Sequence, residues 1–195
     1  DNVPVGRHYG RITYDGDRPG TWSSENDILL HGYWTWDWSD SFQKVKMIDP
    51  VKHEITIAEP HHGYGYTKNQ RYYFLNILEE LDTPGEWFLA PDGMLFYKPL
   101  PGETAATAEV IAPVAEKFVV IMGDPAANRF VEHLTFKGLS FQHGQWLTPP
   151  DGFEPMQAAA AIEGAVQADG ARKVTFEDCE ILHVGTYGIW FRKGC

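Results

Sequence analysis

The sequence predicts an all-β protein whose second part stacks short strands as successive coils, and three observations support this prediction. Short alternating apolar stretches bounded by Gly, Pro, Asp and Asn recur along the 195 residues, whereas long amphipathic helical periodicity is almost absent. The stretch HLTFKGLSFQHG at 133–144 recurs 40 residues later as KVTFEDCEILHVG at 173–185. GAVQADG at 164–170 recurs as GIWFRKG at 188–194. Repeats of this size are typical of stacked β-coils, in which one coil cannot bury its apolar face alone.

The first part, residues 1–106, is predicted to contain strands of varied length joined by irregular loops. EITIAEP at 54–60 and RYYFLNIL at 71–78 alternate as strands do. In GEWFLAPDGMLFYKPL at 85–100, EWFL and MLFYK form a predicted hairpin around a Pro-Asp-Gly turn. LNILEELDT at 75–83 is the one stretch that suggests a helix, and it ends at a Thr-Pro-Gly sequence.

The second part, residues 107–195, is predicted to hold the repeated strands, beginning with KFVVIMG at 117–123. Val166 aligns with Ile189, which gives a coil of 23 residues. The longer offset of 40 residues is then one coil plus an insertion, QWLTPPDGFEPMQAAAAI at 145–162, whose prolines cannot continue a strand.

Alternate residues of a strand face opposite sides, so the repeat also predicts where its side chains point. Four residues are expected to fill the inside of the coil: Val166, Ala168, Ile189 and Phe191. Four others are expected to form two outward rows: Gln167, Asp169, Trp190 and Arg192. Because adjacent strands lie about 4.8 Å apart, Asp169 and Arg192 are expected to pair across one step of the stack.

Composition excludes several classes of function. The 16 Lys and Arg against 27 Asp and Glu give a net charge of −11, which repels nucleic acid and anionic polymers unless cations bridge them. No apolar run is long enough to cross a membrane, and the first residues do not resemble an export signal, so such a signal is absent or already removed. Cys179 and Cys195 are expected to be small buried residues rather than a disulfide.

The repeated strands and the hairpin together resemble a known group of proteins. The stretches at 131–153, at 158–195 and at 75–103 are similar to bacterial right-handed parallel β-helix proteins of the pectin-lyase-like superfamily, most similar to glycoside hydrolase families 141 and 120. The stretch from YDGDRPG at 14–20 to HHGYGY at 61–66 resembles the β-rich, barrel- or sandwich-like accessory domain that interrupts or precedes the helix in such proteins.

The resemblance implies a secreted, extracellular or periplasmic glycoside hydrolase that acts on a xylan-like or pectic plant polysaccharide. Those families are longer than this chain, so it implies a fragment whose catalytic acids lie beyond Cys195, with little activity of its own. Two alternatives keep the fold: a Ca²⁺-dependent polysaccharide lyase, and a non-enzymatic solenoid that binds glycans. No cofactor is expected for a hydrolase, and Ca²⁺ only for a lyase. The last coil would leave an open sheet edge, where self-association is expected.

The outward row carries the candidate binding site. Trp190 offers a ring face for a sugar, while Gln167 and Arg192 offer hydrogen bonds to hydroxyl or carboxylate groups; Trp146, in the insertion, is expected to wall the same groove. The alternative is a solvated row with a surface ion pair worth at most about 1 kcal/mol. Glycosidic cleavage needs two carboxylates, and Asp169 with Glu163 is the pair that flanks this strand.

Other conspicuous residues favour structural roles. Strict alternation would place Trp34, Trp36 and Trp38 on one strand face, as core or as a carbohydrate platform. Adjacent His61 and His62 point to opposite faces of an extended chain, so no metal site is predicted there or elsewhere. The recurrence of His143 as His183 predicts equivalent coil corners, with a hydrogen bond to a backbone carbonyl more than a general base.

Overall fold

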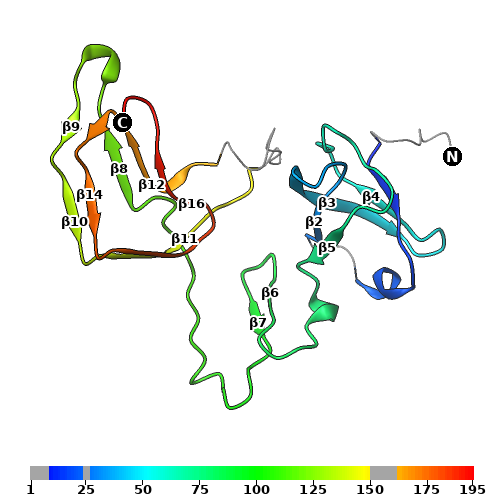
Figure 1. Cartoon of the computed structure of the whole chain (residues 1–195). Helices are drawn as coiled ribbons and strands as arrows, with labels where there is room; N and C mark the ends of the chain where they lie inside the picture. The colour runs from blue at the N-terminus through cyan, green and yellow to red at the C-terminus, as the bar shows by residue number, and fades with distance from the viewer. Residues whose placement is uncertain (1–8, 24–26, 150–161) are drawn as a thin grey trace. The chain divides into compact units, whose positions relative to one another are not determined.

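The computed structural model describes residues 9–23, 27–149 and 162–195, and these residues form strands, loops and three short 3-10 helices. The prediction of an all-β protein is confirmed. The described residues divide into two compact units (Figure 1). We call residues 9–108 with 148–149 the antiparallel unit, and residues 109–147 with 162–195 the parallel-strand unit, after the way in which their strands pair.

A five-stranded antiparallel sheet forms most of the antiparallel unit. Its order is β1-β4-β3-β2-β5, with β1 at Arg11–Thr13, β2 at Leu29–Tyr33, β3 at Asp40–Asp49, β4 at Glu54–Ile57 and β5 at Tyr72–Leu75. The strands predicted at 54–60 and 71–78 are therefore confirmed. The pairing of the long strand β3 with β4 shifts between Val45 and Met47, and such a shift increases the local bend of a strand.

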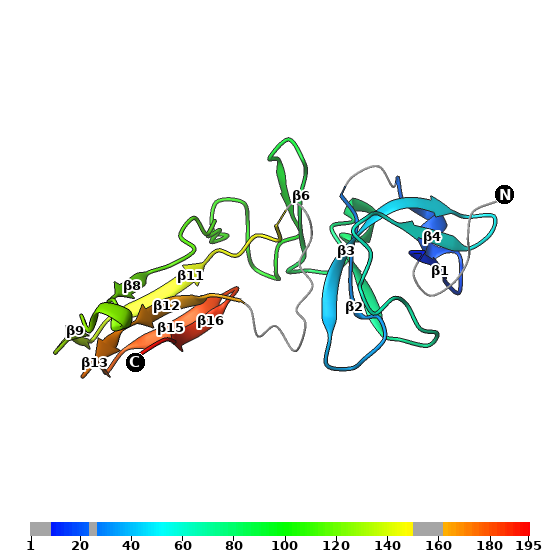
Figure 2. The same ribbon diagram turned by 90° about the horizontal axis from the view of Figure 1, so that it is seen from above.

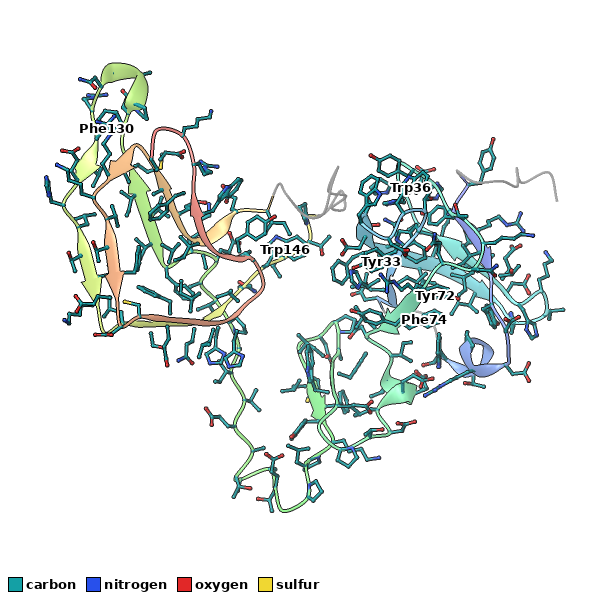
Figure 3. The ribbon with its side chains drawn as sticks, in the orientation of Figure 1. Tyr33, Trp36, Tyr72, Phe74, Phe130 and Trp146 are labelled. Carbon is teal, nitrogen blue, oxygen red and sulfur yellow. The ribbon has the colours of Figure 1, made fainter. Side chains whose placement is uncertain are left out.

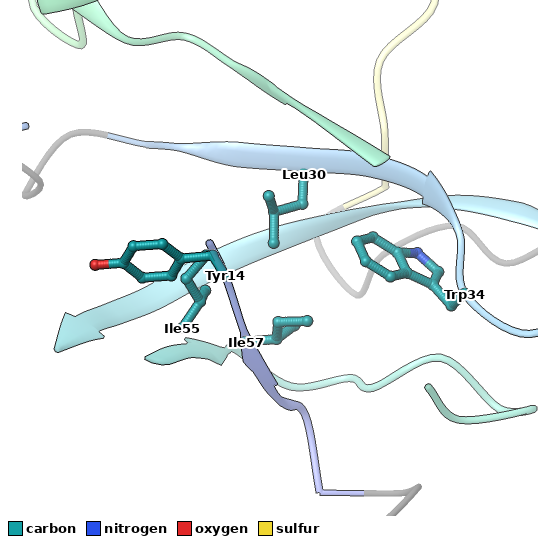
Figure 4. Packing of buried hydrophobic residues seen from close by; sticks show 5 residues of the cluster. All are labelled: Tyr14, Leu30, Trp34, Ile55 and Ile57. Carbon is teal, nitrogen blue, oxygen red and sulfur yellow. The ribbon is translucent and has the colours of Figure 1, made fainter. Parts of the chain in front are cut away.

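One face of this curved sheet carries the core of the unit (Figure 4). Leu30 is completely buried in β2 while its neighbours in the strand are partly exposed, as alternation requires. Burial of a side chain of this size stabilises the fold by about 1.5–3 kcal/mol. The cluster of buried side chains in this core consists of Tyr14, Leu30, Trp34, Ile55 and Ile57.

The predicted hairpin is present as β6, Trp87–Leu89, paired antiparallel with β7, Leu95–Tyr97. Gly93 has φ of 88° in the connecting turn, a conformation that glycine adopts without strain. The predicted helix at 75–83 is wrong, because only the 3-10 turn η2 at Leu78–Glu80 forms there. Asn76 has φ of 62° immediately before it, and a left-handed residue cannot lie within an α-helix.

The parallel-strand unit contains a three-stranded sheet in which all strands run in the same direction (Figures 1 and 2). β12, Gly164–Asp169, lies between β8, Val119–Met122, and β16, Tyr187–Phe191. Val166 lies opposite Ile189 in β16, which is the register predicted from the repeat.

Three further parallel pairs follow this sheet along the chain, and Figure 1 shows them on successive sides of the unit. Thr135 lies opposite Thr175 and Phe141 opposite Ile181, so the predicted offset of 40 residues is confirmed. The pairs are β9 (Val131–Glu132) with β13 (Ala171–Arg172), β10 (Thr135–Lys137) with β14 (Thr175–Glu177), and β11 (Ser140–Gly144) with β15 (Glu180–Val184).

Residues with positive φ recur at the same offset of 40 and mark where the chain changes direction. The equivalent positions are His133 with Lys173, Gly138 with Asp178, and His143 with His183. The predicted equivalence of the last pair is confirmed, because the two imidazole rings stack with their centroids 5.0 Å apart. In the part of the chain that the structure describes, neither ring makes the predicted hydrogen bond to a backbone carbonyl; ring stacking takes its place.

In the parallel-strand unit, the inward-facing side chains of the central strand β12 are buried, whereas those of the edge strand β16 are exposed. Val166 and Ala168 are buried as predicted. Ile189 and Phe191 were also predicted to be buried inside the coil, and this prediction is wrong, because they are 48% and 41% exposed. The Phe191 ring faces inward, 6.4 Å from that of Phe176, but no described strand pairs with the outer edge of β16 to cover it.

The structure also shows the state of the two cysteines and the character of the short helices. Cys179 and Cys195 are both free in the structure. Cys195 is exposed and Cys179 only half-buried, so the expectation that both are buried is wrong. None of the helices among the described residues has the length and apolar character that a membrane span requires.

Candidate functional site

The candidate site lies on the outer face of the sheet formed by β8, β12 and β16. Alternation turns Gln167 and Asp169 to the side opposite the buried Val166 and Ala168. Gln167 lies between Val120 of β8 and Trp190 of β16 in the paired register. We call the surface made by Gln167, Asp169, Trp190 and Arg192 the β12–β16 face.

An ion pair joins the two strands at one end of this face. Arg192 Nη2 donates a hydrogen bond to Asp169 Oδ2, and the backbone N–H of Lys193 donates to Asp169 Oδ1 over 3.1 Å. The Asp169 side chain is only 15% exposed. The hydrogen bond from Arg192, reinforced by that from Lys193, lowers the pKa of Asp169 below its ordinary value in spite of partial burial. The predicted pairing across one step of the stack is confirmed.

Trp190 is held in a defined position between charged and aromatic neighbours. The guanidinium of Arg192 lies 5.0 Å from the centroid of its ring, within the range of a cation–π contact. Tyr187 packs edge-on against it at a centroid distance of 6.0 Å. A Cβ atom on Gly164 would lie 2.9 Å from Trp190 Cβ, so the backbone and Cβ of Trp190 lie beside a position that only glycine leaves open.

Two polar atoms of the β12–β16 face are buried without a hydrogen-bond partner among the described residues. One is Gln167 Oε1, an acceptor on a residue that is 5% exposed, and the other is Arg192 Nε, a donor. A buried polar group that lacks a partner costs about 1–3 kcal/mol, so such groups are few in folded proteins. Both atoms are buried, so a ligand hydroxyl reaches them only when the Gln167 and Arg192 side chains turn outward; it can then donate to the first and accept from the second.

Glu163 belongs to the electrostatic surroundings of the same site. Its carboxylate forms an ion pair with Lys117, just before β8. The pKa of Arg192 is raised chiefly by its hydrogen bond to Asp169, and the negative charges of Asp169 and Glu163 add to this effect. The two carboxylates selected from the sequence are thus both engaged with cations. Asp169 is held in its ionised form, which suits a binding group or a base and not a proton donor.

The fourth predicted binding residue, Trp146, lies on the segment that follows β11. Its backbone and Cβ pack over Gly185, where an added Cβ would lie 3.0 Å from Trp146 Cβ, at the bend before β16 (Figure 3). The backbone and Cβ of Trp146 therefore lie beside this bend. The remainder of the predicted groove wall, residues 150–161, lies outside the described residues.

The three tryptophans at 34, 36 and 38 in the antiparallel unit do not lie on one strand. β2 ends at Tyr33, and residues 34–39 form the loop to β3, so the predicted single strand face is wrong. Trp34 is 2% exposed in the core, whereas Trp36 and Trp38 are 47% and 41% exposed. The turn redirects the chain, which is why three evenly spaced tryptophans do not share one surface.

The histidine motifs have structural surroundings. His62 is 1% exposed, with Nδ1 3.2 Å from Ser41 Oγ, and His61 Nε2 lies 3.1 Å from the carbonyl oxygen of Ile57. Their side chains thus have separate environments, as adjacent residues of an extended chain do. Within residues 9–23, 27–149 and 162–195, no group of three or more His, Cys, Asp or Glu side chains has an arrangement that could hold a metal ion.

Sequence reasoning selected the charged and aromatic residues of the β12–β16 face but missed the glycine beneath Trp190 and the lysine beside Glu163. Gly164 lies opposite Tyr187 in the paired register, so no repeated glycine marked its close contact with Trp190 in the sequence. Lys117 carried no comparable signal, because it lies 46 residues before Glu163 and only the stacking of β8 on β12 brings the two together.

Comparison with known proteins supports the fold. No protein-family model matches the sequence, and no curated protein matches it either. A solved structure described as "Glycoside hydrolase" superposes with a TM-score of 0.66 over 91% of this chain, at 19% sequence identity. The match spans 39% of that protein's length. At this identity the similarity is one of fold alone.

Proposed function

We propose that this chain is part of a glycoside hydrolase that acts on a xylan-like or pectic plant polysaccharide outside the cytoplasm. In this proposal the parallel-strand unit is the beginning of a right-handed parallel β-helix, and the β12–β16 face contacts the glycan. The fold similarity to a glycoside hydrolase and the stacked parallel registers support the proposal. The antiparallel unit would then be the accessory β-domain of such an enzyme.

The observation that carries the proposal is the pair of buried, unpartnered polar atoms beside an aromatic ring. Gln167 Oε1 and Arg192 Nε offer one acceptor and one donor, and the Trp190 indole lies next to them. A sugar ring presents hydroxyl groups around a flat apolar face. In this proposal the ring stacks on Trp190, and its hydroxyl groups pair with Gln167 Oε1 and Arg192 Nε as these two side chains turn outward on binding.

A second candidate function is a glycan-binding solenoid without catalysis in these residues. The engagement of Asp169 by Arg192, and of Glu163 by Lys117, favours it, because both carboxylates already have cationic partners. Under the first proposal Asp169 and Glu163 stay weak candidates for the catalytic pair, with Asp169 as the carboxylate that stays ionised. The proton donor would then be Glu163 or a group outside this chain.

Binding is tested by titrating residues 1–195 with neutral xylo-oligosaccharides and, separately, with oligogalacturonates, using isothermal calorimetry. Trp190→Ala is expected to weaken binding about tenfold, because a stacked aromatic contact beyond its buried area contributes about 0.5–1.5 kcal/mol. Trp87→Ala is the matched control, since Trp87 is 66% exposed and lies on the separate hairpin. An equal loss of oligosaccharide affinity in Trp190→Ala and Trp87→Ala, or no binding by the unmodified chain, would contradict the proposal that the β12–β16 face binds the glycan.

Catalysis is tested in parallel by measuring new reducing ends and the ultraviolet absorbance of unsaturated products, with and without EDTA. Reducing ends without unsaturated products support the hydrolase. Unsaturated products that vanish with EDTA would overturn it in favour of a Ca²⁺-dependent lyase. Binding without either product from this chain supports the binding solenoid as the role of residues 1–195 themselves.

A further inference from the structure

The loop between β2 and β3 presents a second aromatic surface, in the antiparallel unit (Figure 3). Trp36 and Trp38 are 47% and 41% exposed, and their ring planes lie within 8° of parallel at a centroid distance of 6.4 Å. Tyr64 packs edge-on against Trp38 at 5.5 Å. We call these three residues the Trp36–Trp38 platform. Because its two indoles are nearly parallel, a flat ring stacked on either adopts the same orientation.

The loop that carries the platform is fixed by buried hydrogen bonds. Thr35, 7% exposed, donates from Oγ1 to the carbonyl oxygen of Gly65 over 2.8 Å and accepts at its own carbonyl from Gln70 Nε2 over 2.8 Å. The backbone N–H of Ser39 donates to the carbonyl oxygen of Trp36 over 3.1 Å, which closes the turn between the two indoles. A surface held in this way loses little conformational entropy when a ligand binds.

Hydrogen-bonding groups border the platform. Asp37 lies between the two tryptophans in sequence, and its Oδ1 is 3.9 Å from Arg71 Nη2. Arg71 also lies over the ring of Tyr33, 4.4 Å from the centroid. The Asp37 and Arg71 side chains are 76% and 68% exposed, so their contact is a surface ion pair worth about 0–1 kcal/mol, which a ligand can replace.

We infer that the Trp36–Trp38 platform is a second carbohydrate-binding site, with a neutral oligosaccharide as its ligand. This inference takes its ligand class from the proposed function but concerns a different surface. Parallel indoles bind the apolar faces of pyranose rings, and the mixed charges of Asp37 and Arg71 suit hydroxyl groups. The net charge of −11 disfavours a polyanionic chain.

The size of the platform argues against a protein partner. A stable protein interface buries about 800 Å² on each side. Two indoles that are less than half exposed offer on the order of 200 Å² together, given the area that each such ring can bury. A sugar ring is matched to a surface of this extent.

The test titrates residues 1–195 with xylohexaose, cellohexaose and an oligogalacturonate of equal length. Binding is followed through the indole N–H signals in two-dimensional ¹H–¹⁵N NMR spectra. Four chains are compared: unmodified, Trp36→Ala with Trp38→Ala, Trp190→Ala, and Trp87→Ala. Circular dichroism melting verifies that each variant is folded, and Trp36→Phe with Trp38→Phe provides a second variant that retains ring faces.

We expect a neutral hexasaccharide to shift the Trp36 and Trp38 signals, and the double alanine variant to lose about tenfold or more of the affinity at that site. The double phenylalanine variant should retain part of it, and Trp190→Ala should leave these shifts in place. Unchanged binding by the double alanine variant, shifts produced by the oligogalacturonate alone, or an equal loss in Trp87→Ala would each overturn the inference. If Trp190→Ala bound the oligosaccharide as tightly as the unmodified chain while the platform signals still shifted, the β12–β16 face alone would be contradicted, so the two proposals are separable.

Discussion

Gln167 combines nearly complete burial with an amide oxygen that no described residue engages. A glutamine selected only for stability would have a partner or would be replaced by an apolar residue, because an unpaired buried acceptor costs about 1–3 kcal/mol. Gln43 in the antiparallel unit is the contrasting case. It is equally buried, but its amide donates to Ser41 Oγ and accepts from Tyr66.

Gln167→Leu is therefore expected to stabilise the fold while weakening glycan binding. Removing the unpaired oxygen should raise the free energy of unfolding by about 1 kcal/mol, and removing the acceptor should weaken oligosaccharide binding about tenfold. Urea unfolding and calorimetric titration measure the two effects. Gln43→Leu is the control and should destabilise by about 1–3 kcal/mol, because it removes the hydrogen bonds that Gln43 makes with Ser41 and Tyr66. Loss of stability in Gln167→Leu would show that Gln167 is structural.

The Asp169–Arg192 pair predicts a defined dependence on pH. The pKa of Asp169 is lowered in the folded state, chiefly by the hydrogen bond from Arg192. The contribution of the pair to stability is therefore complete above the unfolded-state pKa of about 3.9 and is lost as the pH falls through the lower folded-state pKa. At neutral pH the pair is fully formed.

Arg192→Gln should raise the pKa of Asp169 toward its ordinary value and remove this acid-dependent contribution. Carboxyl ¹³C NMR titration measures the pKa directly, and acid unfolding measures the contribution to stability. Arg129→Gln is the matched control, because Arg129 makes the same kind of contact with Asp124, whose pKa is also lowered. It should raise the pKa of Asp124 and leave that of Asp169 unchanged; a change at both sites would exclude a local cause.

At the scale of the strand, the position of Trp190 depends on the backbone beneath it. A Cβ on Gly164 would lie 2.8 Å from the carbonyl oxygen of Val166 and 2.9 Å from Trp190 Cβ. Both contacts are too close, so the backbone of β12 or of β16 at Trp190 must move. Gly188 in the adjacent strand has its nearest such contact at 3.5 Å, which is ordinary van der Waals distance.

Gly164→Ala is expected to displace Trp190 and destabilise the sheet by about 1–3 kcal/mol, whereas Gly188→Ala should change stability by less than about 0.5 kcal/mol. The Trp190 indole N–H signal and urea unfolding report these effects. Reduced oligosaccharide affinity should accompany the first substitution only. If the two alanine variants behave alike, the close packing of Trp190 on Gly164 is not what positions the ring.

The strands were more predictable than the segments between them. The hairpin at 85–100 and the strand at 117–123 follow from alternation and turn residues, which are local properties. The expected helix at 75–83 failed because Asn76 adopts a left-handed conformation, which helical periodicity does not reveal. The prediction that the tryptophans at 34–38 share one strand face failed because a turn follows β2 and interrupts the alternation.

At the scale of the whole molecule, each compact unit has a core of its own. The antiparallel unit is built around Leu30 and its neighbours, while Ile121, Ala168 and Ala171 form the buried centre of the parallel-strand unit. Because each core lies within one unit, a cavity in one should leave the amide protection of the other unchanged.

Leu30→Ala should destabilise the antiparallel unit by about 2–5 kcal/mol and lower hydrogen-exchange protection in β2, β3 and β4 alone. Val166→Ala is the reciprocal control, since Val166 is also completely buried, and it should affect β8, β12 and β16 alone. Hydrogen exchange followed by mass spectrometry distinguishes the strands. If either substitution lowered protection in both units, they would form one cooperative structure.

The sequence by itself determined the strand register of the parallel-strand unit. Repeated residues such as Phe136 and Phe176 must occupy equivalent positions, because a shift by one residue would turn every apolar side chain to the wrong face. The opposition of Asp169 and Arg192 follows from the same register. Only the tertiary structure decided which of these side chains are buried. Gln167 is enclosed because β12 has a strand on each side, whereas Ile189 is exposed because β16 has one, and burial depends on such neighbours and not on alternation alone.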